Sequence, residues 1–302
     1  MRVLLASDRS ESSDAAAEYL HQLQFSEPIE LNVLSSVPVT ASVGFSGLPA
    51  VVQSVMQEEE VALRKHLDAV CSRFENRTAS TVSNLVVGPP GYEIRSEADK
   101  WNADLIVMGA VGKSMMERVV LGSVSDFVAT HTASSVLVVR PPKPEAAEQP
   151  PRRIMVALDG SKDDTQLIDL LRAIQWPADA ELHLVHVIED LTLYRQDLIE
   201  HMDQHWQQER DTSQQHADEI LKLAEGTIDN IQTAILVDGH TGEALVKYAD
   251  RHQCDLIIAG DHHRNILNRI LLGSVSRYVL RYAHCSVAIA RRKEADEAAA
   301  AT

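Results

Sequence analysis

Two short stretches decide the fold of this chain: VMGAVG at residues 107–112 and GSVS at residues 122–125. The apolar run Leu105–Met108 predicts a buried strand that leads into the first stretch, and the second stretch predicts the start of a helix. Backbone N–H groups at a helix start have no intrahelical partner, and the helix dipole adds partial positive charge there. Glycines in the connecting loop allow it to turn tightly and to approach a ligand. The pattern therefore indicates a phosphate site; the alternative is a plain strand-to-helix connection whose glycines only serve turns.

The same pattern occurs a second time in the chain. Asp8 recurs as Asp159, which is 151 positions later (159 − 8). Gly109 recurs as Gly260 at the same separation (260 − 109), and the GSVS stretch recurs at residues 273–276. A shared separation over the whole length predicts two copies of one domain.

In both copies, apolar strands alternate with amphipathic helices, which is typical of βαβ units and a parallel sheet. We predict a first domain over residues 1–141, a linker over 142–151, a second domain over 152–292 and a tail over 293–302. The linker is rich in Pro, Ala, Glu and Lys and has no apolar periodicity. The fold class is therefore α/β, with two similar domains.

Composition restricts the classes of partner. The chain has 302 residues and a formal net charge of −16, so it would repel the backbone of a nucleic acid. Its three cysteines show no CxxC spacing and are interpreted as reduced thiols, which favours an intracellular compartment. The longest uncharged run, residues 31–57, is interrupted by Pro38 and Pro49 and is too broken for a membrane span. We expect a cytoplasmic protein without a signal peptide and without a membrane or nucleic-acid partner.

The motifs taken together resemble a known family. A strand ending in Asp, the spacing Gly-x₂-Gly-x₉-Gly-Ser and the final VLVVRP at residues 136–141 make each half similar to the universal stress protein domain. The resemblance implies two doubly wound domains, each a five-stranded parallel sheet with helices on both faces. It also implies that the last strands of the two domains pair, which would make an intramolecular pseudo-dimer; a homodimer stays open. In this family some members bind ATP at the carboxyl ends of the strands, and others lack the site.

By resemblance, the nucleotide-binding residues of the first domain are the acid after the first strand, one residue of the second strand, the loop glycines and the start of the following helix. These are Asp8, Ser36, Gly109, Gly112, Gly122, Ser123 and Val124. The implied cofactor is ATP or a related adenine nucleotide, bound with or without Mg²⁺. Ser36 departs from the family, where this position is more often apolar.

These ligand-binding roles have ordinary structural alternatives. Asp8 would serve equally well in capping the following helix. Lys113 is either a phosphate contact or a solvated surface lysine. Ser123 and Ser125 offer hydroxyls to a phosphate, and Ser123 is also a candidate helix cap.

The second domain matches the family less completely. The matching residues are Asp159, Val187, Gly260, Gly273 and Ser274. The middle glycine of the loop, however, is replaced by His263. If that position needs a positive φ, a residue other than glycine costs roughly 1–2 kcal/mol, and the imidazole would also intrude on a phosphate. We therefore expect nucleotide mainly in the first domain.

Several histidines of the second half fall near the predicted strand ends. His186, His240, His262 and His263 could approach Asp159, and imidazole and carboxylate are good ligands for zinc. Their spacing matches no standard metal signature, so we predict no metal site. The histidines of the charged stretch 189–223, among them His216, are expected to face solvent.

Enzyme signatures are missing from the sequence. It contains no P-loop, no dinucleotide-binding glycine motif and no nucleophile elbow. No obvious general base would face a γ-phosphate, so we predict no catalytic residues and at most weak ATP hydrolysis. The first hypothesis is a regulatory or protective stress-response protein whose uncharged loop over residues 38–49 closes over nucleotide or docks a partner. A slow ATPase or phosphotransferase and an interaction scaffold without nucleotide are the alternatives.

Overall fold

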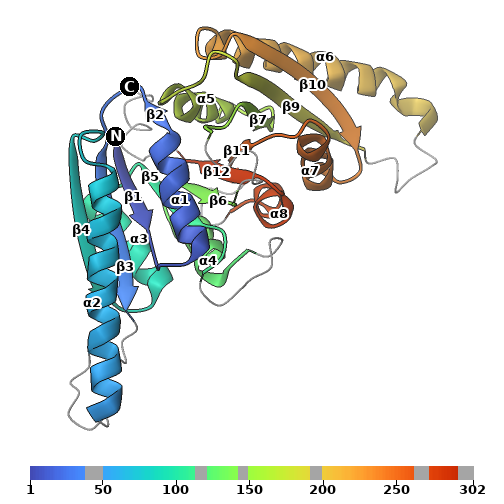
Figure 1. Cartoon of the computed structure of the whole chain (residues 1–302). Helices are drawn as coiled ribbons and strands as arrows, with labels where there is room; N and C mark the ends of the chain where they lie inside the picture. Colours follow the sequence, from blue (N-terminus) through green and yellow to red (C-terminus); the bar gives the residue numbers. More distant parts are fainter. Residues whose placement is uncertain (38–49, 113–120, 142–148, 191–198, 262–271, 292–302) are drawn as a thin grey trace. The chain divides into compact units, whose positions relative to one another are not determined.

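The computed structural model describes residues 1–37, 50–112, 121–141, 149–190, 199–261 and 272–291. These residues form two compact units: unit 1 lies within Met1–Ala147, and unit 2 lies within Glu148–Arg291 (Figure 1). Most of the predicted linker, the predicted tail and the uncharged loop over residues 38–49 fall outside the described residues.

The described part of unit 1 contains a five-stranded parallel sheet. In spatial order its strands are β4 (Ser80–Val87), β3 (Glu30–Val37), β1 (Arg2–Ala6), β5 (Leu105–Gly109) and β6 (Ser135–Val139). Its helices are α1 (Glu11–Gln22), α2 (Ala50–Arg73), α3 (Pro90–Trp101) and α4 (Ser123–His131). A two-residue strand, β2 (Gln24–Phe25), follows α1 and was not predicted.

The described part of unit 2 repeats this order. Its strands are β10 (Asn230–Asp238), β9 (Glu181–Glu189), β7 (Arg153–Leu158), β11 (Leu256–Gly260) and β12 (Ser286–Ala290). Its helices are α5 (Asp164–Arg172), α6 (Ile199–Ala224), α7 (Thr241–Arg251) and α8 (Ser274–Tyr282). The short strand β8 (Ile174–Gln175) corresponds to β2.

Helices cover both faces of each sheet. In unit 1, the crossovers from β1 to β3 and from β3 to β4 run in one direction across the sheet, and those from β4 to β5 and from β5 to β6 run in the other. Because such crossovers are right-handed, α1 and α2 cover one face, and α3 and α4 cover the opposite face. The predicted doubly wound α/β fold is thus confirmed for both units.

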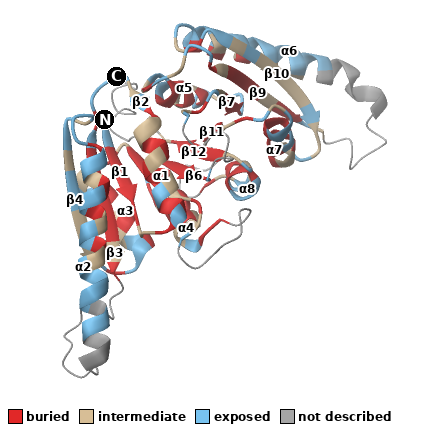
Figure 2. Ribbon diagram, viewed as in Figure 1, coloured by how far each residue is buried: buried red, intermediate tan, exposed pale blue. Residues whose placement is uncertain are grey.

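The core of each unit lies along the central strands, which are buried over most of their length (Figure 2). In β1, Val3, Leu4 and Leu5 are fully buried, as Ile154, Met155 and Val156 are in β7. Apolar side chains on both faces of a strand are expected where helices cover both sides of the sheet. This packing fixes the carboxyl ends of β1 and β5, and of β7 and β11, where the candidate sites lie.

No helix among the described residues is both long enough and apolar enough to span a membrane. The expected pairing of β6 with β12 depends on how the two units are placed relative to one another and stays a prediction.

Candidate functional site

The candidate site of unit 1 lies where the winding of the sheet changes direction. β1 and β5 are neighbours, but the chain continues from β1 to β3 on one side and from β5 to β6 on the other. In open α/β sheets, the crevice outside such a pair of strands is the usual place for a ligand. Asp8 follows β1 at this point, and Gly109 is the last residue of β5.

Three of the predicted residues come together in this crevice. A Cβ atom at Gly112 would lie 3.1 Å from Asp8 Oδ2. The Gly122 N–H donates to the Ala110 carbonyl oxygen at 2.8 Å, and a Cβ at Gly122 would lie 3.1 Å from that same oxygen. Asp8, Gly112 and Gly122 therefore line one small backbone concavity that a larger side chain would narrow.

The start of α4 adds hydrogen-bond donors to this concavity. Gly122 is the N-cap residue and provides no side-chain cap, so Ser123 is the first helical residue rather than the cap. The N–H groups of Ser123 and Val124 have no partner inside the helix, and Ser123 is exposed. The arrangement can hold an anion by backbone N–H groups.

The hydroxyl of Ser125 has an internal role. It donates to the Gly109 carbonyl oxygen at 2.8 Å and lies 3.1 Å from that of Ala110. Ser125 is 2% exposed, so its side chain fixes the loop to α4 instead of contacting a phosphate.

Gly109 is required by packing. A Cβ at this position would lie 2.4 Å from Ser12 Oγ and 2.6 Å from the Ser12 carbonyl oxygen, so α1 can rest on β5 only where there is no side chain. The equivalent Cβ at Gly260 in unit 2 would meet its nearest atoms at 3.7 Å, an ordinary van der Waals contact.

Asp8 shapes the turn between β1 and α1. Its Oδ1 accepts a hydrogen bond from the Ser10 N–H at 3.0 Å. Ser10, and not Asp8, is the N-cap of α1, since its hydroxyl accepts the Ser13 N–H at 3.1 Å. Ser36, on β3, is half-buried, and its hydroxyl donates to the Gly88 carbonyl oxygen at 3.4 Å.

The second-domain residues occupy equivalent places in unit 2. Gly260 ends β11, Gly273 is the N-cap of α8, and Ser274 is its first residue. Asp159 follows β7 and is exposed, and Val187 is buried in β9.

The positive φ considered for the middle glycine of the loop is not found at Gly112. The described glycines with positive φ are Gly88, Gly160 and Gly226, so Gly112 does not need glycine for its backbone conformation. What favours glycine at Gly112 is the closeness of the Asp8 carboxylate. His262, His263 and Lys113 lie outside the described residues.

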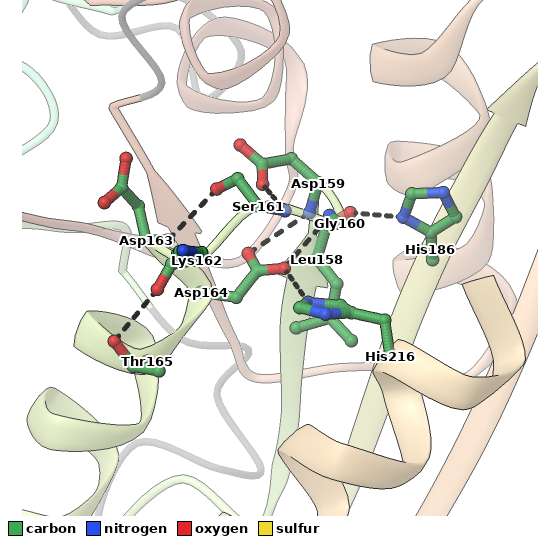
Figure 3. Close-up of polar contacts among 10 residues, drawn as sticks. All are labelled: Leu158, Asp159, Gly160, Ser161, Lys162, Asp163, Asp164, Thr165, His186 and His216. Atoms are coloured by element: carbon green, nitrogen blue, oxygen red, sulfur yellow. Dashed lines mark hydrogen bonds and ion pairs between the residues drawn. The ribbon is translucent and has the colours of Figure 1, made fainter. Parts of the chain in front are cut away.

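Unit 2 carries a buried carboxylate that the sequence analysis missed. Asp164 lies at the start of α5 (Figure 3). Its side chain is buried, with 3% of the residue exposed. Its carboxylate accepts the N–H groups of Asp159 at 3.2 Å and Gly160 at 3.0 Å. It also accepts a hydrogen bond from His216 Nε2 at 2.8 Å. The turn after β7 is thus filled by an internal anion; the residue at the same position of unit 1 is Ser13 (164 − 151).

Burial raises the pKa of Asp164 to about 6, and the neighbouring charge of Asp159 raises it as well, whereas the hydrogen bond from His216 opposes the shift. The expectation that His216 faces solvent is wrong, because this side chain is 21% exposed and is bonded to Asp164. A comparison of positions 13 and 164 in the two repeats would have revealed the extra acid, but the charged pattern of α6 gave no sign of a buried partner.

His186 and His240 are not brought to a common ligand. His186 Nδ1 donates to the Leu158 carbonyl oxygen at 3.1 Å, and burial lowers the pKa of His186. His240 Nδ1 accepts the Glu243 N–H at 3.1 Å and caps α7. Within the described ranges, no group of three or more His, Cys, Asp or Glu side chains is arranged to hold a metal ion.

A further acid marks the strand ends of unit 2. Asp261 follows β11 and pairs with Arg291 Nε at 2.8 Å. Unit 1 has Ala110 at the corresponding position (261 − 151). These three strand-end positions therefore all carry carboxylates in unit 2, at Asp159, Asp164 and Asp261, whereas in unit 1 only Asp8 does.

The sequence model of the universal stress protein family matches this chain twice, over residues 1–140 and over residues 151–291. The chain belongs to the universal stress protein family. The resemblance noted from the motifs is confirmed, and so is the tandem arrangement.

Curated relatives of this universal stress protein each correspond to about half of it. Universal stress protein MJ0531 of Methanocaldococcus jannaschii is 33% identical over 150 residues, 48% of this chain and 84% of the relative. Universal stress protein Sll1388 of Synechocystis sp. is 30% identical over 152 residues, 46% of this chain and 97% of the relative.

Solved structures that match nearly the whole chain support the fold. A universal stress protein from Archaeoglobus fulgidus has a TM-score of 0.63 at 22% identity, and the match covers 97% of each chain. A putative universal stress protein from Pseudomonas aeruginosa has a TM-score of 0.58 at 15% identity and covers 96% of this chain and 92% of that one.

Proposed function

We propose that this universal stress protein binds ATP, or a related adenine nucleotide, in unit 1, and that it acts in the stress response as a regulatory or protective protein. The observation that supports this proposal most strongly is the concavity in which Asp8, Gly112 and Gly122 meet at the start of α4. Its backbone donors suit the phosphates, and Asp8 suits a hydrogen bond from a ribose hydroxyl. Mg²⁺ would accompany the polyphosphate and supply positive charge near Asp8.

Charge supports the choice of unit 1. The chain as a whole is strongly acidic, so an anionic ligand has to be attracted by local donors. In unit 2, Asp159 and the buried Asp164 add two carboxylates to the turn after β7, and their negative charge disfavours a phosphate there. In unit 1, Ser13 and Ala110 replace two of the three acids.

The proposed function is the binding of ATP, and not its hydrolysis. No side chain among the described residues of the concavity is arranged as an obvious general base for water attack on a γ-phosphate. Phosphate release from ATP is therefore expected to be slow at most, and a strong ATPase activity would contradict this part of the proposal.

A matched pair of variants tests the proposal by isothermal titration of the full chain with ATP. We expect one site per chain in the wild type. Asp8→Asn should weaken binding by about tenfold, which is ~1.4 kcal/mol, because the neutral amide oxygen is a weaker acceptor for the ribose hydroxyl than the carboxylate. Asp159→Asn, the same change in unit 2, should leave the affinity within about twofold. An absence of ATP binding, or an effect confined to Asp159→Asn, would contradict the proposal.

A further inference from the structure

The two residues that flank Asp8 are both bonded to α2. The hydroxyl oxygen of Ser7 lies 2.8 Å from His66 Nε2, and the guanidinium of Arg9 pairs with the carboxylate of Glu59. His66 and Glu59 are seven positions apart (66 − 59), which is about two helical turns, so both side chains lie on one face of α2. Helix α2 therefore holds the turn after β1 at two points, with Asp8 between them.

The contact of His66 with Ser7 is expected to matter more than the ion pair. Ser7 is 4% exposed, so this hydrogen bond is shielded from water. The side chain of Glu59 is 46% exposed, and exposed ion pairs such as Arg9–Glu59 contribute little to stability. Asp14 Oδ1 also faces His66 Nε2, but at 3.8 Å, which is beyond hydrogen-bond distance. The position of the turn therefore depends mainly on His66.

The sequence of unit 2 permits neither contact. Leu158 occupies the position of Ser7 (158 − 151) and has no hydroxyl, and Gly160 occupies the position of Arg9 (160 − 151) and has no side chain. The backbone nevertheless has a left-handed conformation at both positions, with a φ of +64° at Arg9 and +80° at Gly160. This conformation is unfavourable for an arginine and not for a glycine. Unit 1 thus retains an unfavourable residue whose side chain reaches α2.

The long helix of unit 2 also carries a histidine at this place. Ala217 of α6 is buried as Leu67 of α2 is, at a separation of 150 positions (217 − 67), so His216 is the counterpart of His66 (216 − 150). His216 donates to Asp164, whose carboxylate accepts the N–H groups of the turn after β7. The imidazole of unit 2 therefore acts through an internal carboxylate, whereas that of unit 1 bonds directly to the residue that ends the first strand.

We propose that His66 is a positioning residue of the nucleotide site and directs the carboxylate of Asp8 toward a ribose hydroxyl. Asp8 directly follows the serine that His66 holds, and its Oδ1 accepts the Ser10 N–H at 3.0 Å across the same turn. Glu59 supports the turn through Arg9 and has a smaller effect. The inference rests on the proposed function, because it requires Asp8 to contact the ribose.

Ribose specificity distinguishes positioning of Asp8 from a general loss of structure. Isothermal titration compares ATP with 2′,3′-dideoxy-ATP, which lacks the ribose hydroxyls, on the full chain. We expect the wild type to bind ATP about tenfold more tightly than the analogue. His66→Leu should weaken ATP binding by about tenfold and change the affinity for the analogue by less than about twofold. His66→Gln should recover most of the ATP affinity, because its amide can bond to the Ser7 hydroxyl.

A matched pair of surface variants tests the second contact. Glu59→Gln removes the charge that pairs with Arg9, and Glu60→Gln removes the same charge from the next residue, which pairs with Arg64. Both glutamates are exposed, so both variants are expected to fold. Glu59→Gln should weaken ATP binding by about threefold, and Glu60→Gln should leave it unchanged. Equal affinities of the two variants would refute the supporting role of Glu59.

Equal weakening of both nucleotides by His66→Leu, or no weakening of either, would overturn the inference. If the wild type binds neither nucleotide, or does not distinguish them, the proposed ribose contact fails, and hydrogen exchange of the Ser10 amide without ligand decides whether His66 positions Asp8. This amide should exchange faster in His66→Leu than in the wild type and slowly again in His66→Gln. Unchanged exchange in His66→Leu would then overturn the inference.

Discussion

Gly109 and Gly260 end equivalent strands, yet only Gly109 is in close contact with a helix. The backbone of Ser12 in α1 lies where a Cβ of residue 109 would be, whereas the space beside Gly260 accepts a methyl group. We predict that Gly109→Ala lowers the free energy of unfolding of unit 1 by about 1–3 kcal/mol, the range for overpacking.

The matched variant Gly260→Ala should be neutral or slightly stabilising, because alanine is favoured over glycine within a strand. Thermal unfolding of both variants beside the wild type measures the difference. Equal destabilisation by the two substitutions would refute the packing role of Gly109.

The buried Asp164 predicts a pH dependence that belongs to unit 2. The pKa of a carboxyl group in an unfolded chain is about 4, and burial raises the pKa of Asp164 to about 6. The folded unit therefore binds more protons than the unfolded one between these values. The contribution of protonated Asp164 to the free energy of unfolding is complete below about pH 4. It falls by up to about 3 kcal/mol as pH rises through about 6. His216, which donates to the carboxylate, limits the loss.

Asp164→Asn removes this titration. Hydrogen exchange of the β7 amides between pH 4 and 7 measures the free energy of opening in both proteins. The stability of the variant relative to the wild type should increase with pH over this range. A difference that is constant with pH would show that Asp164 does not titrate as described.

At the scale of elements, the strands and the glycine loops were predictable because their signals are local. The apolar run before Gly109 and the GSVS stretch gave β5 and the start of α4 to within one residue. The start of α5 was not predictable in the same way. α5 begins two residues later, relative to the repeat, than α1 does, since Glu11 corresponds to residue 162 and α5 starts at Asp164.

The reason for this difference is a tertiary contact. The carboxylate of Asp164 reaches back to the turn after β7 and is held by His216 from α6. A pattern read along one helix carries no information about a partner 52 positions away. The same limit applies to the positive φ of Arg9 and to the burial of its Nε, which are visible only in three dimensions.

At the scale of the whole molecule, one duplicated topology presents two different strand-end surfaces. The sheet order is the same in both units, so the fold alone does not distinguish them. The distinction comes from a few side chains: Ser13 against Asp164, Ala110 against Asp261, and Arg9 against Gly160. We infer that duplication kept the scaffold while one copy closed its turn with its own carboxylate.

The central claim is that nucleotide binds in unit 1 and not in unit 2. Native mass spectrometry of the full chain with ATP, applied to Gly122→Val and to the equivalent Gly273→Val, tests it most directly. A side chain at Gly122 would be forced against the Ala110 carbonyl oxygen, 3.1 Å from its Cβ, and would narrow the concavity. We predict one bound nucleotide in the wild type and in Gly273→Val, and none in folded Gly122→Val. Binding that survives Gly122→Val but is abolished by Gly273→Val would contradict the account.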